Sequence, residues 1–255
     1  MVEPNFGIII QARLNSKRFP KKILKRLDGK NTVLEFQISR ISKVFDKKNI
    51  FVATTLNKED IKICRISKKN HIRFFKGSEK NVIKRYIDCA KKFKIKTIIR
   101  VTSDCPLVDP KLIKKMLNKF SKIKCDYFSN TYPLKDSTFP DGTDIEIFKL
   151  ESLIKAYNII KDKNDREHVT TFFWKKRNIF NCKMYKLSKN LSDFRFCIDY
   201  KDDLILMKKI IKHLKEKNLF GNVIDITNFL KKNKTLNNIS QKNKIKVIKY
   251  RKDLY

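Results

Sequence analysis

The chain has 255 residues, of which 41% are hydrophobic and 11% aromatic, so it is long and apolar enough to bury a core and is not of the disordered class. Its formal net charge of +35 is typical of proteins that bind nucleic acid or an anionic membrane. The lysines are spread over almost every segment, however, and the many Lys, Asn and Ile residues with only 5 Gly resemble the bias of an AT-rich genome. We therefore expect solvated helix faces and no nucleic-acid partner.

The first half of the chain alternates short apolar runs with longer amphipathic stretches. This alternation is typical of β-α-β units, so we predict an α/β fold with a mainly parallel sheet flanked by helices. Strands are predicted at Phe6–Gln11, Ile50–Thr54, Ile72–Phe75 and Thr97–Val101. Helices are predicted between them at Val33–Lys43, Glu59–Lys69 and Asn81–Phe93.

The second half is less regular. Pro110–Lys122 predicts a helix, because proline is favoured in a first helical turn. Asp144–Phe148 and Arg195–Ile198 predict strands, and Lys201–Lys217 predicts a strong helix with one apolar face. The chain shows no repeat and no linker, so we expect one domain over residues 1–230. The tail over 231–255, rich in Lys and Asn, is expected to pack loosely.

The six cysteines and the apolar segments exclude some classes of protein. No two cysteines lie within four positions of each other, so neither a CxxC redox motif nor a zinc knuckle forms locally. The N-terminal residues lack the pattern of a signal peptide, and 18 apolar residues never run together. We expect a cytoplasmic protein without membrane insertion.

A cationic loop follows the first predicted strand and runs from Gln11 to Lys22. Ligands of open parallel sheets bind beyond the carboxyl ends of the strands, where the charges of Arg13 and Lys22 would hold a triphosphate and its departing pyrophosphate. A basic surface loop without such a role is an equal alternative on the residues alone. Neither a GxGxxG loop nor a GxxxxGK[ST] loop is present, which argues against a dehydrogenase or a P-loop ATPase.

Two aspartates stand at the ends of predicted strands. Asp104 follows the strand that begins at Thr97, and Asp199 follows Arg195–Ile198. Mg²⁺ prefers one or two carboxylates together with phosphate oxygens, so Asp104 is a candidate ligand. Capping a helix is the alternative role, but Asp109 is better placed for it. Asp199 is open to both roles, and spacing does not decide whether the two aspartates share one ion.

Several motifs follow one another along nearly the whole chain. They are Ile9–Arg13 with Lys22–Leu24, Gly77–Glu79 with Val82–Ile83 and Arg85–Tyr86, Arg100–Leu107, Phe139–Gly142, Arg166–Thr170, and Asp199 before Asp202–Leu204. Taken together, they resemble the SpsF-type cytidylyltransferases, a family named for spore-coat polysaccharide biosynthesis and similar to CMP-Kdo and CMP-sialic acid synthetases.

The resemblance implies a nucleotide-diphospho-sugar transferase fold of GT-A type and an enzyme that couples CTP to a sugar acid with Mg²⁺ for surface polysaccharide biosynthesis. It also suggests a homodimer. Arg13, Lys22 and Asp104 would be catalytic, and Asp104 with Asp199 would hold the metal. The implied nucleotide-binding residues are Gln11, Ala12, Arg13, Ser16, Arg18, Lys22, Glu79 and Arg85. The implied substrate-binding residues are Asp141, Arg166, Glu167 and His168, although a structural role for His168 is equally open.

The chain departs from the family pattern near the implied site. Asn15, Lys21 and Ser103 stand where the family usually has glycine, and Tyr200–Lys201 replaces a Thr-Pro pair after Asp199. Two other functions are weighed against the transferase. A GT-A glycosyltransferase that consumes a nucleotide sugar needs the same fold and metal. A basic nucleic-acid-binding protein is less favoured, and its affinity would fall steeply with salt.

Overall fold

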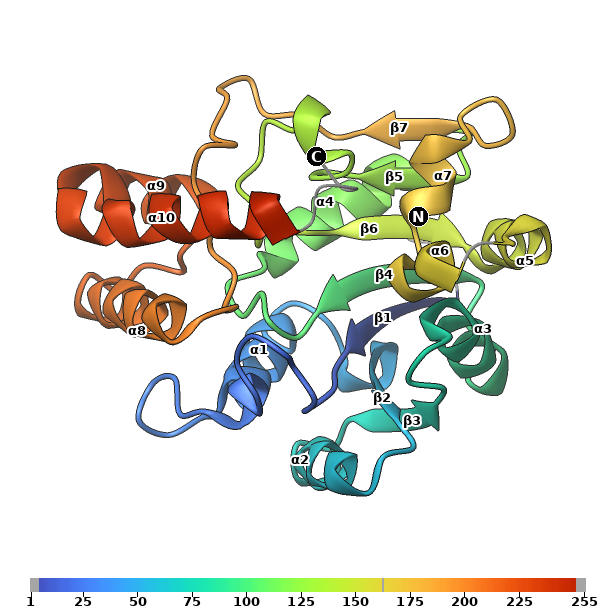
Figure 1. The fold of residues 1–255 in the computed structure, drawn as a ribbon, viewed down its shortest axis with the longest axis horizontal. Coiled ribbons are helices and arrows are strands. Elements are labelled where there is room, and N and C mark those ends of the chain that lie inside the picture. The colour runs from blue at the N-terminus through green and yellow to red at the C-terminus, as the bar shows by residue number, and fades with distance from the viewer. Residues whose placement is uncertain (1–4, 162, 251–255) are drawn as a thin grey trace.

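The computed structural model describes residues 5–161 and 163–250, in which a seven-stranded sheet lies between layers of helices (Figure 1). The strands are β1 (Phe6–Gln11), β2 (Ile50–Thr55), β3 (Arg73–Gly77), β4 (Thr97–Thr102), β5 (Tyr127–Ser129), β6 (Glu146–Lys149) and β7 (Cys182–Met184). Their order in the sheet is β3-β2-β1-β4-β6-β5-β7. Within the described ranges, β6 runs antiparallel to both of its neighbours, and the other strand pairs are parallel.

Helices follow most of the strands. They are α1 (Val33–Ile41), α2 (Ile61–Lys69), α3 (Val82–Lys92), α4 (Pro110–Phe120), α5 (Leu150–Ile159), α6 (Lys163–His168), α7 (Thr171–Lys175), α8 (Lys201–Glu216), α9 (Val223–Lys232) and α10 (Lys234–Tyr250). A short 3-10 helix, η1, spans Lys22–Leu24. Among the residues described, no helix combines the length and the apolar character needed to cross a membrane.

Two apolar cores lie on opposite faces of the sheet, because successive side chains of a strand point to opposite sides. On β1, Ile8 and Ile10 belong to the core that α1, α2 and α4 cover. Ile9 belongs to the core that α3, α5 and α7 cover. With helices on both faces, every residue of β2 is buried, which explains the apolar run Ile50–Ala53 with which it begins.

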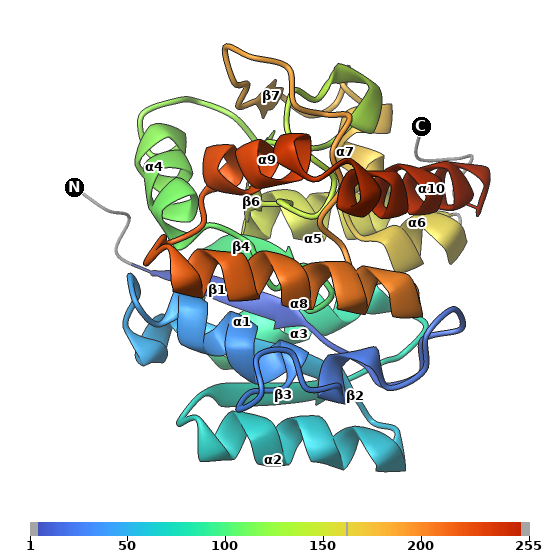
Figure 2. The ribbon, with the colours of Figure 1, turned by 90° about the vertical axis from the view of Figure 1, so that its left-hand side faces the viewer.

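The last three helices are neighbours on one side of the molecule (Figure 2). A third core forms where α8 and α9 pack on the segment that precedes α8. The prediction of a loosely packed tail covers 231–255, of which 251–255 lie outside the described residues. Within the described part, α10 contacts both of these helices and buries Ser240, Asn243 and Val247. The buried face of α10 is partly polar, which is why its hydrophobic pattern is weak.

The predicted elements of the first half are confirmed with small shifts at their ends, as are the predicted helices after Asp109 and Tyr200. The predicted strand at Arg195–Ile198 is wrong. This segment makes one isolated bridge, between Arg195 and Asp141, and does not join the sheet. Its N–H groups at Phe196 and Ile198 donate instead to carbonyls in two loops, so it passes between loops as buried extended chain.

The topology brings three loops to one edge of the sheet. The neighbouring strands β1 and β4 end level with each other, with Gln11 opposite Thr102. After β1 the chain passes to β2 in one direction along the sheet, and after β4 it passes to β5 in the other, and a crevice opens where the strand order reverses in this way. Because β6 is antiparallel to β4, its first residue Glu146 pairs with Arg100 near the end of β4. The loops after β1, after β4 and before β6 therefore meet.

Candidate active site

A cavity of about 370 Å³ opens at this edge of the sheet. Its volume falls within the range of small-molecule sites. The three loops contribute to its wall together with the corner between α6 and α7 and the segment before α8. The lining residues are Gln11, Arg13, Ser16, Lys17, Arg18, Lys22, Val82, Arg100, Thr102, Ser103, Asp104, Cys105, Tyr132, Asp144, His168, Thr170, Thr171, Cys197 and Asp199.

Lys22 lies at the centre of an ion network in this cavity. The preceding residue, Lys21, has a φ of 56°, which is the left-handed region that favours glycine, and glycine is the residue that the family pattern has here. The turn directs the buried Lys22 side chain toward two carboxylates. Its Nζ donates to Asp104 Oδ2 at 2.8 Å and to Asp199 Oδ1 at 3.0 Å. A third bond goes to the Ile198 carbonyl at 2.6 Å.

The charges of this network support one another. Burial lowers the pKa of Lys22, but Asp104 and Asp199 raise it more, so its pKa lies above the ordinary value. Burial raises the pKa of Asp104, but the Lys22 ammonium lowers it more, to about 2. The cation and the carboxylate are therefore both charged at neutral pH.

Asp199 is held by two further cations. Arg18 Nη2 donates to its Oδ1 at 2.6 Å, and Arg195 Nη2 donates to its Oδ2 at 2.6 Å. Arg195 is fully buried and also donates to Asp203 Oδ1 at 3.0 Å. The role of helix cap, which the sequence left open for Asp199, falls to Asp203, because Asp203 Oδ2 accepts the N–H groups of Asp199 and Tyr200, both at 2.8 Å. The carboxylate of Asp199 therefore points into the network.

Asp203 also connects the network to the last helix. Its Oδ1 accepts a hydrogen bond of 2.8 Å from Asn243 of α10. Ser240 of the same helix donates to the Arg195 carbonyl at 3.0 Å and accepts from the Arg195 N–H at 3.1 Å. A continuous chain of buried polar contacts thus runs from α10 to the cavity.

Most of the residues named by the resemblance lie together in the cavity wall. These are Gln11, Arg13, Ser16, Arg18, Lys22, Asp104, His168 and Asp199. Asp109, by contrast, caps α4 as predicted, since its side chain accepts the Lys111 N–H at 2.8 Å. The segment that carries His168 is strained, because the next residue, Val169, is buried with a φ of 63°.

Five other described residues that the resemblance names do not line the cavity. They are Ala12, Glu79, Arg85, Asp141 and Arg166. Ala12 is buried in the core. Glu79 accepts a hydrogen bond from Asn57, while Arg85 and Arg166 donate to nearby backbone carbonyls. Asp141 is buried with its Oδ2 3.3 Å from Arg195 Nε. Glu167 lies in α6, but its side chain is outside the described part of the structure.

Sequence reasoning did not assign a role to several residues of the cavity wall. Arg100 is one of them: it pairs with the buried Glu146 and donates to Gln11 Oε1 at 3.2 Å. Its place near the end of β4 was a usable signal. Tyr132, Thr170 and Thr171 come from the irregular second half, where no periodicity indicated a site.

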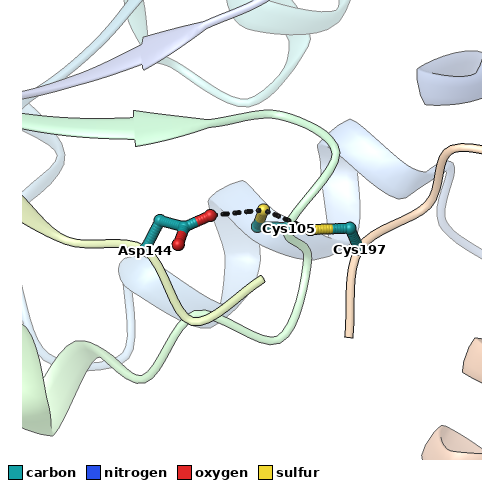
Figure 3. A group of neighbouring side chains, drawn as sticks. All are labelled: Cys105, Asp144 and Cys197. Atoms are coloured by element: carbon teal, nitrogen blue, oxygen red, sulfur yellow. Dashed lines mark hydrogen bonds between the residues drawn. The ribbon is translucent and has the colours of Figure 1, made fainter. Parts of the chain in front are cut away.

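Two groups of side chains in this wall are suited to metal ions. Asp104 and Asp199 offer the hard oxygen ligands that Mg²⁺ prefers, and both already bind one shared cation, the Lys22 ammonium. This convergence fits a Mg²⁺ site. The second group is Cys105, Asp144 and Cys197, whose ligand atoms all lie within 4.8 Å of one another (Figure 3).

Comparisons with known proteins agree on one family. The family model described as cytidylyltransferase matches residues 7–226. A cytidylyltransferase from Leptospira borgpetersenii serovar Hardjo-bovis has a TM-score of 0.85 and 33% identity, covering 91% of this chain and 96% of its own. The spore coat polysaccharide biosynthesis protein SpsF of Bacillus subtilis is 29% identical and covers 82% of this chain and 87% of its own.

A more distant structure has the same fold. CMP:2-keto-3-deoxy-manno-octonic acid synthetase, solved in complex with CTP, has a TM-score of 0.60 and covers 82% of this chain and 99% of its own. Its identity of 10% supports the fold alone. The predicted fold, a mainly parallel sheet flanked by helices as in nucleotide-diphospho-sugar transferases, is confirmed.

Proposed function

We propose, since this chain belongs to the cytidylyltransferase family, that it joins the CMP part of CTP to a sugar acid and releases pyrophosphate. One observation carries the proposal: the cationic loop with Arg13 and Lys22 and the strand-end Asp104 line one cavity. SpsF acts in polysaccharide biosynthesis by name, and the more distant synthetase makes a CMP-linked sugar acid by name. The first supports a product destined for a surface polysaccharide, and the second supports a sugar acid as acceptor.

In the proposed reaction, a hydroxyl oxygen of the sugar acid attacks the α-phosphorus of CTP in line with the departing pyrophosphate. Catalysis is then positioning and charge stabilisation. Arg13 and Lys22 would hold the phosphate oxygens. Asp104 and Asp199 would hold Mg²⁺, which neutralises phosphate charge when it is bound.

Lys22 must rearrange to take this role. An ammonium group has three donors, and those of Lys22 are engaged by Asp104, Ile198 and Asp199. A bond to a phosphate oxygen therefore requires the release of at least one of these contacts. We propose that Lys22 neutralises the two carboxylates before the nucleotide binds and turns toward the phosphates when it does.

The corner between α6 and α7 is proposed to bind the sugar acid. His168, Thr170 and Thr171 line the cavity from this corner, which offers an imidazole and two hydroxyls to the hydroxyl groups of a sugar. The strained backbone at Val169 fixes the direction of the side chains on either side of it.

The experiment is a pyrophosphate-release screen. The common nucleoside triphosphates are each combined with Mg²⁺ and a panel of nonulosonic and octulosonic acids. We expect release with CTP and at least one sugar acid. The variant Asp104→Asn should abolish release while the protein stays folded by circular dichroism.

The matched control is Asp109→Asn, which lies on the same loop and caps α4. It should keep both activity and stability, because asparagine caps helices as well as aspartate does. Full turnover by Asp104→Asn would contradict the proposal. Transfer from a nucleotide sugar without any pyrophosphate release would favour the glycosyltransferase alternative instead.

The cysteines bear on the compartment. All six are free thiols, and five of them belong to an apolar core, pack against one or line the cavity. Free thiols are typical of a reducing compartment, so we propose that the reaction takes place in the cytoplasm.

A further inference from the structure

The side chains of Cys105, Asp144 and Cys197 come from three segments that are distant in sequence. Cys105 lies in the loop after β4, Asp144 before β6, and Cys197 in the extended segment before α8. All three are buried, yet each contributes to the cavity wall. Figure 3 shows the Cys105 sulfur between the carboxylate of Asp144 and the sulfur of Cys197. The proposed transferase reaction uses none of them.

Two of the three distances within this group match those of ligands around one tetrahedral metal ion, and the third is at most 4.8 Å. Cys105 Sγ lies 3.6 Å from Cys197 Sγ and 3.6 Å from Asp144 Oδ2. Zn²⁺ binds sulfur at about 2.3 Å and carboxylate oxygen at about 2.1 Å, so tetrahedral ligands lie about 3.8 Å apart for two sulfurs and about 3.6 Å apart for sulfur and oxygen. Both observed distances are close to these edges before any ion binds.

The polar surroundings also point to a cation. Asp144 Oδ1 is buried, and the Thr131 hydroxyl is its near polar neighbour, but no described residue reaches it with full hydrogen-bond geometry. A buried carboxylate oxygen without a donor costs free energy, which a bound cation offsets. A second carboxylate is close, since Asp141 Oδ1 lies 3.4 Å from Cys197 Sγ. A cation bound by this group would therefore lie near two carboxylates, of which Asp141 is also paired with Arg195.

We propose that Cys105, Cys197 and Asp144 form a binding site for a thiophilic divalent cation such as Zn²⁺ or Cd²⁺, separate from the carboxylates assigned to Mg²⁺. Thiolate ligands select such ions over Mg²⁺, which prefers oxygen ligands. Binding forms two metal–sulfur bonds and one metal–oxygen bond and releases both thiol protons to the solvent. Three protein ligands would leave the fourth position of a tetrahedral ion to water.

The bound ion would cross-link the loop after β4 and the segment before α8, which carry the aspartates of the ion network. Cys105 directly follows Asp104, and Cys197 stands two residues before Asp199. These segments are already joined by one backbone hydrogen bond, from the Ile198 N–H to the Asp104 carbonyl at 2.9 Å. A ligand that binds only the folded state stabilises it, so the cation should raise the melting temperature of the nucleotide-free protein.

The test uses the full chain without nucleotide or sugar, under a phosphine reductant that does not bind metal. Co²⁺ is the probe, because a tetrahedral thiolate site gives a thiolate-to-cobalt charge-transfer band and intense visible bands. We expect one equivalent of Co²⁺ to produce both, and Zn²⁺ to remove them by displacement. Cys105→Ser and Cys197→Ser should each lose about half of the charge-transfer intensity and bind Co²⁺ at least tenfold more weakly.

Two further variants separate ligands from bystanders. Asp144→Asn should weaken binding but keep the charge transfer from both sulfurs. Cys64→Ser should leave the Co²⁺ affinity and the charge-transfer band unchanged, since Cys64 is a buried thiol of α2 that does not line the cavity. Zn²⁺ should raise the melting temperature of the wild type and of Cys64→Ser, but not of the double variant C105S/C197S.

Absence of the charge-transfer band, or undiminished Co²⁺ affinity in C105S/C197S, would overturn the proposal. The second result would place the ion on oxygen ligands alone. Because no substrate is present, failure here leaves the transferase proposal as it stands. Failure of the pyrophosphate screen likewise leaves the metal result unchanged.

Discussion

Replacing Lys22 by methionine tests the ion network directly. Methionine keeps an unbranched apolar side chain but removes the ammonium that lies 2.8 Å from Asp104 Oδ2 and 3.0 Å from Asp199 Oδ1. The two carboxylates then share the cavity without the cation between them. We expect a less stable protein that no longer releases pyrophosphate.

The pKa of Asp104 gives the size of the effect. Burial raises this pKa and Lys22 lowers it more, from 3.8 to about 2. A pKa difference of this size corresponds to about 2 kcal/mol of folding stability at neutral pH. The folded-state pKa is the lower one, so the contribution is complete above the unfolded value of about 4 and is lost as the pH falls toward 2. In this variant Asp199 keeps its ion pairs with Arg18 and Arg195, so the change at Asp199 lowers the folding stability by less.

The assay is urea unfolding with EDTA present, at neutral pH and at about pH 3. Lys22→Met should be less stable than the wild type by about 2 kcal/mol at neutral pH, and the difference should shrink at the lower pH. Lys21→Met is the matched control. Lys21 pairs with Glu59 at 2.8 Å, but both side chains are largely exposed, so we expect little change. Equal stability at neutral pH, or a difference that is undiminished in acid, would refute the reasoning.

Two further substitutions address the framework of the site. Gly142→Ala should destabilise the protein by at least about 2 kcal/mol in thermal unfolding. Gly142 has a φ of 98°, and an added Cβ would lie 2.6 Å from the Cys197 nitrogen. An unchanged melting temperature would argue against this backbone contact. Asn243→Ala should cost about 2 kcal/mol in urea unfolding, because it removes a buried bond to the Asp203 carboxylate. The exposed Asn238→Ala should be neutral, and equal losses in both variants would contradict the packing of α10.

The parts of the fold that the sequence predicted are those with a local signal. β1, β2 and the helices that follow them have their own apolar periodicity, and the cationic loop and Asp104 directly follow strands. Position at a strand end was sufficient to bring Lys22 and Asp104 to one place, because parallel neighbours share an edge.

The parts that the sequence did not predict depend on distant partners. Arg195–Ile198 has the composition of a strand, but its N–H groups find loop carbonyls and Ser240 instead of a neighbouring strand. Motif membership likewise does not fix the direction of a side chain: Arg85 shares a motif with Val82, which lines the cavity, and still lies outside the cavity wall among the described residues. Cys105 and Cys197 of the proposed metal site are 92 positions apart, so no short motif in the sequence indicates that they meet.

Buried polar contacts connect Asn243 of α10 through Asp203 and Arg195 to Asp199. The final helix therefore supports a side chain of the candidate active site. Energetic coupling between two sites is reciprocal, and through these contacts we expect a ligand bound at Asp199 to stabilise the packing of α10 as well. Amide protons of α10 would then exchange more slowly in the presence of substrate, although this helix contributes no residue to the lining of the cavity among the residues described. By the same linkage, proteolytic removal of α10 would lower the affinity for the nucleotide.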